Sequence, residues 1–161
     1  MTEEKKETIM NYLGIDPGNK GAMALLDCEG RIIESIKMPQ TPMDILTTLE
    51  SICGTAGDLV CYIEDVGNGM PGQSSKATAT FARHNGHLEM ALLALRIPTE
   101  KITPAKWQKS LNLLTKKNER KTAHKARIKA WSQRMFPSIS VTLANSDALA
   151  IAYYGYKDRK K

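Results

Sequence analysis

The sequence lacks paired cysteines, long hydrophobic runs, internal repeats and low-complexity segments, and these absences narrow the class of protein. Its three cysteines, Cys28, Cys53 and Cys61, are scattered and form no CxxC pair, which is typical of reduced thiols in an intracellular protein. No apolar stretch approaches the roughly 20 residues of a membrane-spanning helix. The first ten residues, MTEEKKETIM, contain no apolar signal core, so neither a membrane protein nor an exported one is predicted.

Positive charge is abundant and unevenly placed. The net charge is +6 over 161 residues, yet the segment from Lys101 to Arg134 contains eleven Lys or Arg and one acid, Glu119. That segment carries +10 and the rest of the chain −4. Such asymmetry favours a polyanionic partner, although a solvated helical face is an equally good explanation of a charge run alone.

The hydrophobic pattern predicts an α/β protein of one domain. Residues 11–16, 22–27 and 31–38 have the pattern of a three-stranded meander, and residues 59–64 and 97–103 of two further strands. Helices are expected after Thr41, over 75–95, after Thr103, over 119–135 and from about residue 146. Three meander strands followed by alternating elements predict a mixed five-stranded sheet flanked by helices.

Acidic residues stand where predicted strands end and where the last helix starts. Asp16 follows the first strand, Glu64 ends the fourth, and Asp147 lies in the first turn of the last helix. If the first and fourth strands are parallel neighbours, Asp16 and Glu64 emerge at the same edge. Converging carboxylates need a cation to offset their repulsion, and oxygen ligands suit Mg²⁺ or Mn²⁺. Taken singly, each acid also has an ordinary explanation as a solvated or helix-capping residue.

Three stretches resemble the motifs of the RuvC-type Holliday-junction resolvases and their phage relatives. They are LGIDPGNKGAMALL, YIEDV and SDALAIAYYG, and the resemblance spans residues 11 to 156. It implies an RNase H-like fold over residues 11–157, with a charged tail at 1–10 and a basic tail at 158–161. It also implies a homodimeric endonuclease that resolves four-way DNA junctions by paired nicks.

The resemblance also implies which residues are catalytic, which metal they hold and where the protein acts. Asp16, Glu64 and Asp147 would be catalytic residues that hold Mg²⁺ or Mn²⁺, two ions per active site. The protein would act in the cytoplasm of a bacterium or a phage-infected cell, without a membrane partner or a nucleotide cofactor. An actin-like kinase or ATPase, which uses a similar Asp-x-Gly turn, is excluded by size because such folds need two domains.

One position departs from the family pattern. The family usually has an Asp or a His three residues before the final Asp, and here that fourth metal-site position is Ala144. A neutral amide at Asn145 is a poor substitute for a carboxylate. A junction-binding protein with weak or no cleavage is therefore the alternative to an active nuclease.

The basic helix predicted over 119–135 would present two cationic rows to DNA. At about 100° per residue, His124, Ile128, Trp131 and Met135 form an apolar stripe between a lysine row and an arginine row. The arginine row is Arg120, Arg127 and Arg134, and the lysine row is Lys121, Lys125 and Lys129. The residues expected to bind DNA are Lys76, Phe81, Arg83, Lys116, Lys117, Arg120, Lys121 and Lys125.

Three features of the helix predicted over 75–95 and of the residues just after it each allow two interpretations. Phe81 either stacks in the junction or packs in the core. The stretch LEMALLALRI, residues 88–97, is either partly a dimer interface or only core. His84 and His87 have HxxH spacing, but without further Cys or His nearby they indicate polar helix residues near DNA more than a zinc site.

Overall fold

The structure, a computed structural model, describes residues 9–67 and 72–161 and contains a five-stranded sheet in the order β3-β2-β1-β4-β5. β1 (Asn11–Asp16), β2 (Ala22–Leu26) and β3 (Ile32–Lys37) form the predicted antiparallel meander. β4 (Leu59–Glu64) runs parallel to β1, and β5 (Thr99–Ile102) runs parallel to β4. The predicted mixed sheet is therefore confirmed. Residues 1–8 of the expected N-terminal tail lie outside the described residues.

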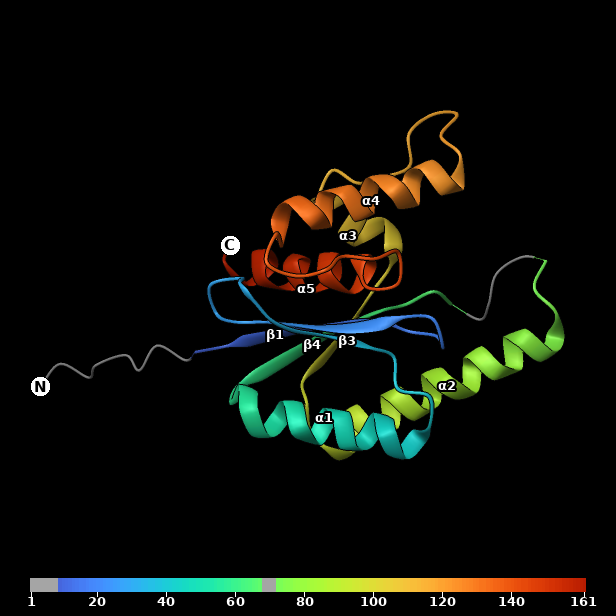
Figure 1. Cartoon of the computed structure of the whole chain (residues 1–161). Coiled ribbons are helices and arrows are strands. Elements are labelled where there is room, and N and C mark those ends of the chain that lie inside the picture. Colours follow the sequence, from blue (N-terminus) through green and yellow to red (C-terminus); the bar gives the residue numbers. More distant parts are fainter. Residues whose placement is uncertain (1–8, 68–71) are drawn as a thin grey trace, which may run out of the picture.

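Helices cover both faces of this sheet (Figure 1). α1 (Pro42–Ala56) and α2 (Ser75–Ala94) lie on one side; α3 (Pro104–Ser110), α4 (Lys121–Met135) and α5 (Ser146–Arg159) lie on the other, with α5 between the sheet and α4. Side chains alternate along β1, so Leu13 and Ile15 join the core under α1 and α2 while Tyr12 joins the core under α5. In the part of the chain that the structure describes, no helix could cross a membrane.

Local sequence signals explain where several elements begin and end. The Thr41 hydroxyl accepts the backbone N–H of Asp44 at 3.1 Å and donates to its carboxylate at 2.7 Å, which caps α1 as predicted. Thr103 caps α3 through the N–H of Lys106 at 3.4 Å. The basic helix begins two residues later than predicted, at Lys121. α5 continues to Arg159, into the segment predicted as a basic tail.

The apolar stripe predicted for α4 is wrong in part. Ile128 is buried, but Met135 is 37% exposed and Ser132 is fully buried. The Ser132 hydroxyl donates to the carbonyl of Ser146 at 3.0 Å. The start of α5 thus presents a polar backbone group to α4, and a small hydroxyl residue meets it better than an apolar side chain does.

α5 lies unusually close to the sheet because small residues face it. Ala148 and Ala152 lie one turn apart on the side of α5 that meets β1, and both are completely buried. Gly14 of β1 lies directly under the helix, and a Cβ atom at this glycine would collide with the backbone of Ala148 and Ala152. This close packing fixes the start of α5, and with it Asp147, over the end of β1.

Candidate active site

Three acids that are far apart in the sequence meet at one edge of the sheet. Asp16 and Glu64 are the last residues of β1 and β4, which are parallel neighbours with Ile15 paired to Ile63. Both carboxylates therefore leave the sheet at the same edge. Asp147 lies in the first turn of α5, which packs on β1. The structure thus brings together the three acids that the sequence pattern selected.

The three carboxylates share a poorly hydrated environment. Burial, followed by the charges of Asp147 and Glu64, raises the pKa of Asp16 to about 8. Burial and then Asp147 raise the pKa of Glu64 to about 7. Burial also raises the pKa of Asp147. Repulsion among desolvated acids is typical of functional sites, where a bound cation would relieve it.

Lys125 is the basic residue whose charge acts on all three acids. It lies in the second turn of α4 and lowers the pKa of Asp16, Glu64 and Asp147, against the larger effect of burial. The sequence predicted Lys125 as one of a row of phosphate-binding lysines. Its place beside the acids adds a second possibility, that it acts on the phosphate closest to the site.

Trp107 positions one of the acids and was not assigned this role from the sequence. Its ring is completely buried, and its indole N–H donates to the Glu64 carboxylate at 3.0 Å. This hydrogen bond lowers the pKa of Glu64, in opposition to burial. A buried tryptophan needs an acceptor for its N–H, which is the signal that could have linked it to an acid at a strand end.

Replacing Trp107 by phenylalanine tests this positioning role. Trp107→Phe removes the donor and keeps an aromatic ring, so the pKa of Glu64 rises and less of its ionised form is present at neutral pH. If the site hydrolyses DNA, the acidic limb of its pH–rate profile should move upward by about half a unit to one unit. Trp131→Phe, at a half-buried ring that packs on Tyr153 at 5.5 Å, is the control. Superimposable pH profiles for the wild type and Trp107→Phe would contradict the assignment.

The donor set fits a divalent cation in its chemistry and charge. Carboxylate oxygens are the ligands that Mg²⁺ and Mn²⁺ prefer, and a cation would offset the repulsion that, after burial, contributes to the raised pKa values of Asp16 and Glu64. Within residues 9–67 and 72–161, no three His, Cys, Asp or Glu side chains are gathered closely enough to hold a metal ion.

The residue at the fourth position of the family pattern provides no metal ligand. Ala144 lies in the turn before α5 and not in the helix. The side chain of Asn145 is committed elsewhere: its carbonyl accepts the Thr142 N–H at 2.7 Å, and its amide donates to Ser35 at 3.1 Å. Asn145 therefore holds the turn in place and is not turned toward the acids.

The residues expected to bind DNA separate into two regions. Lys116, Lys117, Arg120 and Lys121 are exposed in the α3–α4 loop and at the start of α4, which project from the molecule (Figure 1). Lys76 and Arg83 are exposed on α2, while Phe81 is half-buried against Gly18 in the β1–β2 turn. The second region lies beside the β1–β2 turn, which follows Asp16 in the chain.

One member of the predicted arginine row has a different role. Arg127 forms an ion pair with Glu119 at 2.8 Å and donates to the Leu114 carbonyl at 2.6 Å. His124 contacts the Leu113 carbonyl at 2.7 Å. These bonds tie the loop to α4, so Arg127 supports the exposed lysines instead of facing a phosphate itself.

Comparisons with known proteins support the fold. No family model and no curated protein sequence matches the chain. Among solved structures, Thermus thermophilus RuvC in complex with a Holliday junction substrate is 15% identical, with a TM-score of 0.62 over 94% of this chain and 96% of that one. Another T. thermophilus RuvC structure is 14% identical, with a TM-score of 0.60 over 95% of this chain and 96% of that one.

A third match is weaker. The large terminase nuclease of the thermophilic phage G20c is 14% identical, with a TM-score of 0.46 over 92% of this chain and 83% of that one. The two RuvC matches and the sheet topology define an RNase H-like fold. The resemblance indicated by the sequence motifs is therefore confirmed at the level of the fold.

Proposed function

We propose that this protein is an endonuclease that resolves four-way DNA junctions by paired phosphodiester hydrolysis. The observation that carries the proposal is the meeting of Asp16, Glu64 and Asp147 at one edge of an RNase H-like sheet. The similarity in fold to RuvC bound to a junction, over nearly the whole of both chains, supports branched DNA as the substrate. Such a protein would act in the cytoplasm of a bacterium or a phage-infected cell.

In this proposal the three carboxylates bind Mg²⁺ or Mn²⁺, two ions per active site. The metal would supply an activated water and stabilisation of the leaving oxygen. Trp107 holds the Glu64 carboxylate in one orientation, and Lys125 offers a positive charge to the phosphate next to the acids. The exposed cations Lys116, Lys117, Arg120 and Lys121 bind phosphates farther along the arms, and affinity should therefore fall steeply with salt.

The proposal is tested with a labelled synthetic four-way junction and a linear duplex of matched sequence. We expect Mg²⁺-dependent nicking of the junction and much weaker nicking of the duplex. Preference for the junction in binding, without nicking at any concentration of Mg²⁺ or Mn²⁺, would favour the alternative function. Equal binding to both DNAs would contradict either function.

The alternative is a junction-binding protein with impaired cleavage. One observation favours it: Ala144 provides no ligand at the fourth position. A site with one negative charge fewer is expected to bind divalent cations more weakly. The two functions share the DNA surface and differ in whether the acids can hold a cation.

Restoring an acid at this position separates the two functions. Ala144→Asp should lower the Mg²⁺ concentration needed for half-maximal nicking by about tenfold and raise the rate, since a further carboxylate ligand joins the site. Asn145→Asp is the matched control, because it places a carboxylate at the adjacent position, in a side chain that is hydrogen-bonded to Thr142 and Ser35. Identical Mg²⁺ titrations of an active wild type and Ala144→Asp would show that position 144 does not serve the metal.

The proposed enzyme is a homodimer, because two symmetric nicks need two active sites related by a two-fold axis. Within LEMALLALRI, the structure places Leu88, Ala91 and Leu92 in the core. Met90 and Leu93 are 61% and 70% exposed on the outer face of α2. A groove of about 280 Å³ runs beside Leu93, between α2 and β5. This apolar surface is the proposed interface.

A charge at the centre of this surface tests the interface. Leu93→Glu should weaken dimerisation by about 100-fold, because a carboxylate would be buried without a partner. Ile33→Glu, at a 51% exposed position on the opposite edge strand, is the control. Light scattering or analytical ultracentrifugation at micromolar protein gives the mass of each. A wild type that is monomeric, or a Leu93→Glu variant that dimerises as well as the wild type, would contradict this interface.

A further inference from the structure

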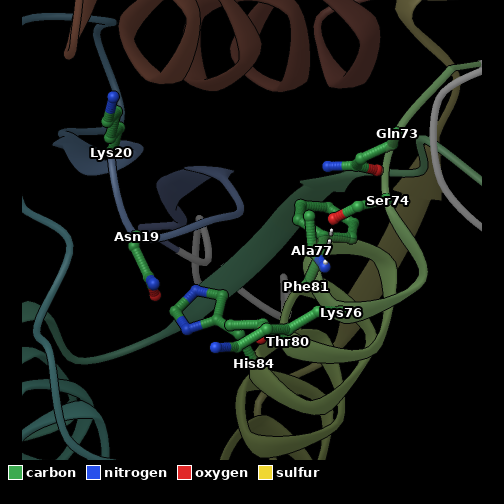
Figure 2. Close-up of a pocket in the computed structure, with 9 residues that line it drawn as sticks. All are labelled: Asn19, Lys20, Gln73, Ser74, Lys76, Ala77, Thr80, Phe81 and His84. Atoms are coloured by element: carbon green, nitrogen blue, oxygen red, sulfur yellow. Dashed lines mark hydrogen bonds between the residues drawn. The ribbon is translucent and has the colours of Figure 1, made fainter.

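A pocket next to the acidic edge has no ligand assigned to it in the proposed function. It lies between the β1–β2 turn and the first turns of α2, and has a volume of about 570 Å³ (Figure 2). Asn19 and Lys20 form one wall, only a few residues along the chain from Asp16. Lys76, Phe81 and His84 are among the α2 residues that form the other wall.

His84 is the most unusual residue of this pocket. The side chain is 7% exposed, and its Nε2 atom has no hydrogen-bond partner among the described residues. A buried ring nitrogen without a partner costs free energy unless a ligand or water meets it. Figure 2 shows the ring directed toward the Asn19 side of the pocket. Burial and His87 lower the pKa of His84, so the ring is neutral near pH 7 and offers one donor and one acceptor.

The other walls supply complementary chemistry. Phe81 lies against the turn, since a Cβ atom at Gly18 would lie 3.4 Å from its ring, and it gives the pocket an aromatic surface. Lys20 and Lys76 are exposed cations at the pocket. The N-terminus of the 20-residue helix α2 lies at the same place and favours an anion.

The combination excludes simpler ligands. A phosphate alone would leave the Phe81 surface unused and fill little of the volume, and an apolar ligand would leave the buried His84 Nε2 without a partner. One nucleotide matches every feature: a base has an aromatic face and a hydrogen-bonding edge, and its phosphate is an anion.

We propose that this pocket binds one unpaired nucleotide of a DNA strand, with its base against Phe81, its base edge at Asn19 and His84, and its phosphate at Lys20 and Lys76. The inference rests on the proposed function, which supplies the strand. It assigns to the pocket a share in selecting where the junction is cut, because a pocket with an amide and an imidazole distinguishes one base edge from another.

Imidazole NMR signals give a direct test, since the chain has three histidines. Thymidine 5′-monophosphate at millimolar concentration should shift the His84 signals and leave those of His124 in place. Inorganic phosphate at the same concentration should leave His84 unchanged. A shift of His84 by phosphate alone would reduce the pocket to an anion site, and no shift with any of the four deoxynucleotides would overturn the proposal.

A second experiment tests whether the bound nucleotide belongs to the junction DNA. Abasic sites are placed one at a time around the exchange point of a junction, and binding is measured without divalent metal. At one position we expect the abasic site to weaken binding by the wild type about tenfold, from lost stacking. The same lesion should change binding by less than about twofold in His84→Leu and in Asn19→Ala, because the contact is already absent.

Ala79→Ser, at an exposed position of α2 and outside the pocket lining, is the control and should behave as the wild type. If a mononucleotide shifts the His84 signals but no abasic site changes junction binding, the pocket binds a free nucleotide, and the proposal that it binds a nucleotide of DNA is overturned. If the protein shows no preference for the junction over duplex, the proposed function fails. If it prefers the junction but shows neither a His84 shift nor an effect of any abasic site, only the proposal for the pocket is contradicted.

Discussion

Asp16→Asn is expected to lower junction nicking by about 1,000-fold or more while DNA binding is kept or improved. The amide keeps the shape of the side chain but removes one of the three carboxylates proposed to hold the metal, and with it a charge that repels phosphate. Nicking is measured under single-turnover conditions and binding by titration of a labelled junction without divalent metal. A variant that nicks at close to the wild-type rate would show that Asp16 is not a metal ligand.

The same substitution should stabilise the metal-free protein at alkaline pH. The pKa of Asp16 is raised from 3.8 to about 8 in the folded protein, so the folded state binds the proton more tightly than the unfolded state does. The free energy of unfolding therefore falls as the pH rises from about 4 to 8, and Asn removes this loss. We expect a gain of about 2 kcal/mol at pH 8 and little change at pH 4.

Asp27→Asn provides a control of opposite sign. The Asp27 carboxylate accepts the backbone N–H groups of Glu29 and Arg31 at 2.8 and 2.9 Å. These bonds contribute to the lowered pKa of Asp27, against the effect of burial. The amide variant should therefore be somewhat less stable than the wild type at neutral pH. Urea unfolding at the two pH values measures both variants, and destabilisation by Asp16→Asn at pH 8 would contradict the electrostatic account.

Gly14→Ala is expected to cause a large loss of stability, although it adds only one methyl group. The new Cβ would meet the backbone of Ala148 and Ala152, and helix backbone cannot move aside as a flexible side chain can. α5 would have to lift off β1, which disturbs a core of completely buried residues and displaces Asp147. We expect a destabilisation of more than about 3 kcal/mol, or failure to fold, measured by urea or thermal unfolding.

Gly54→Ala is the matched control for this prediction. Gly54 lies within α1, and nothing lies within 4 Å of a Cβ atom built there. Alanine should therefore stabilise the helix by about 0.5 to 1 kcal/mol. A Gly14→Ala variant as stable as the wild type would contradict the close packing of α5 on β1 that positions the third acid.

Much of the fold follows from short-range patterns in the sequence. The apolar residues Tyr12, Leu13 and Ile15 of β1, the capping residue Thr41 and the uninterrupted apolar run of β4 each specify their element locally. The acids at the ends of β1 and β4 could be placed together because parallel neighbours end at the same edge. Asp147 joins them through the helix that packs over Gly14.

The interactions that depend on tertiary contacts were not predictable in the same way. Trp107 and Glu64 are 43 residues apart in the sequence, and no local pattern links them. Arg127 shares its helical face with other arginines, so only the position of Glu119 and the loop carbonyls shows that it anchors the loop. Ser132 replaces an apolar contact because the start of α5 exposes a carbonyl to α4.

Mapping the cut sites on a four-way junction tests the central claim most directly. Each of the four strands is end-labelled in turn, and products formed with Mg²⁺ are resolved on denaturing gels for the wild type and for Asp16→Asn. The account predicts nicks at symmetric positions on two opposite strands with the wild type, and none above background with Asp16→Asn. Nicks at equal rates on linear duplex, or symmetric nicks that persist in Asp16→Asn, would contradict the claim that this acidic edge is the active site of a junction-resolving nuclease.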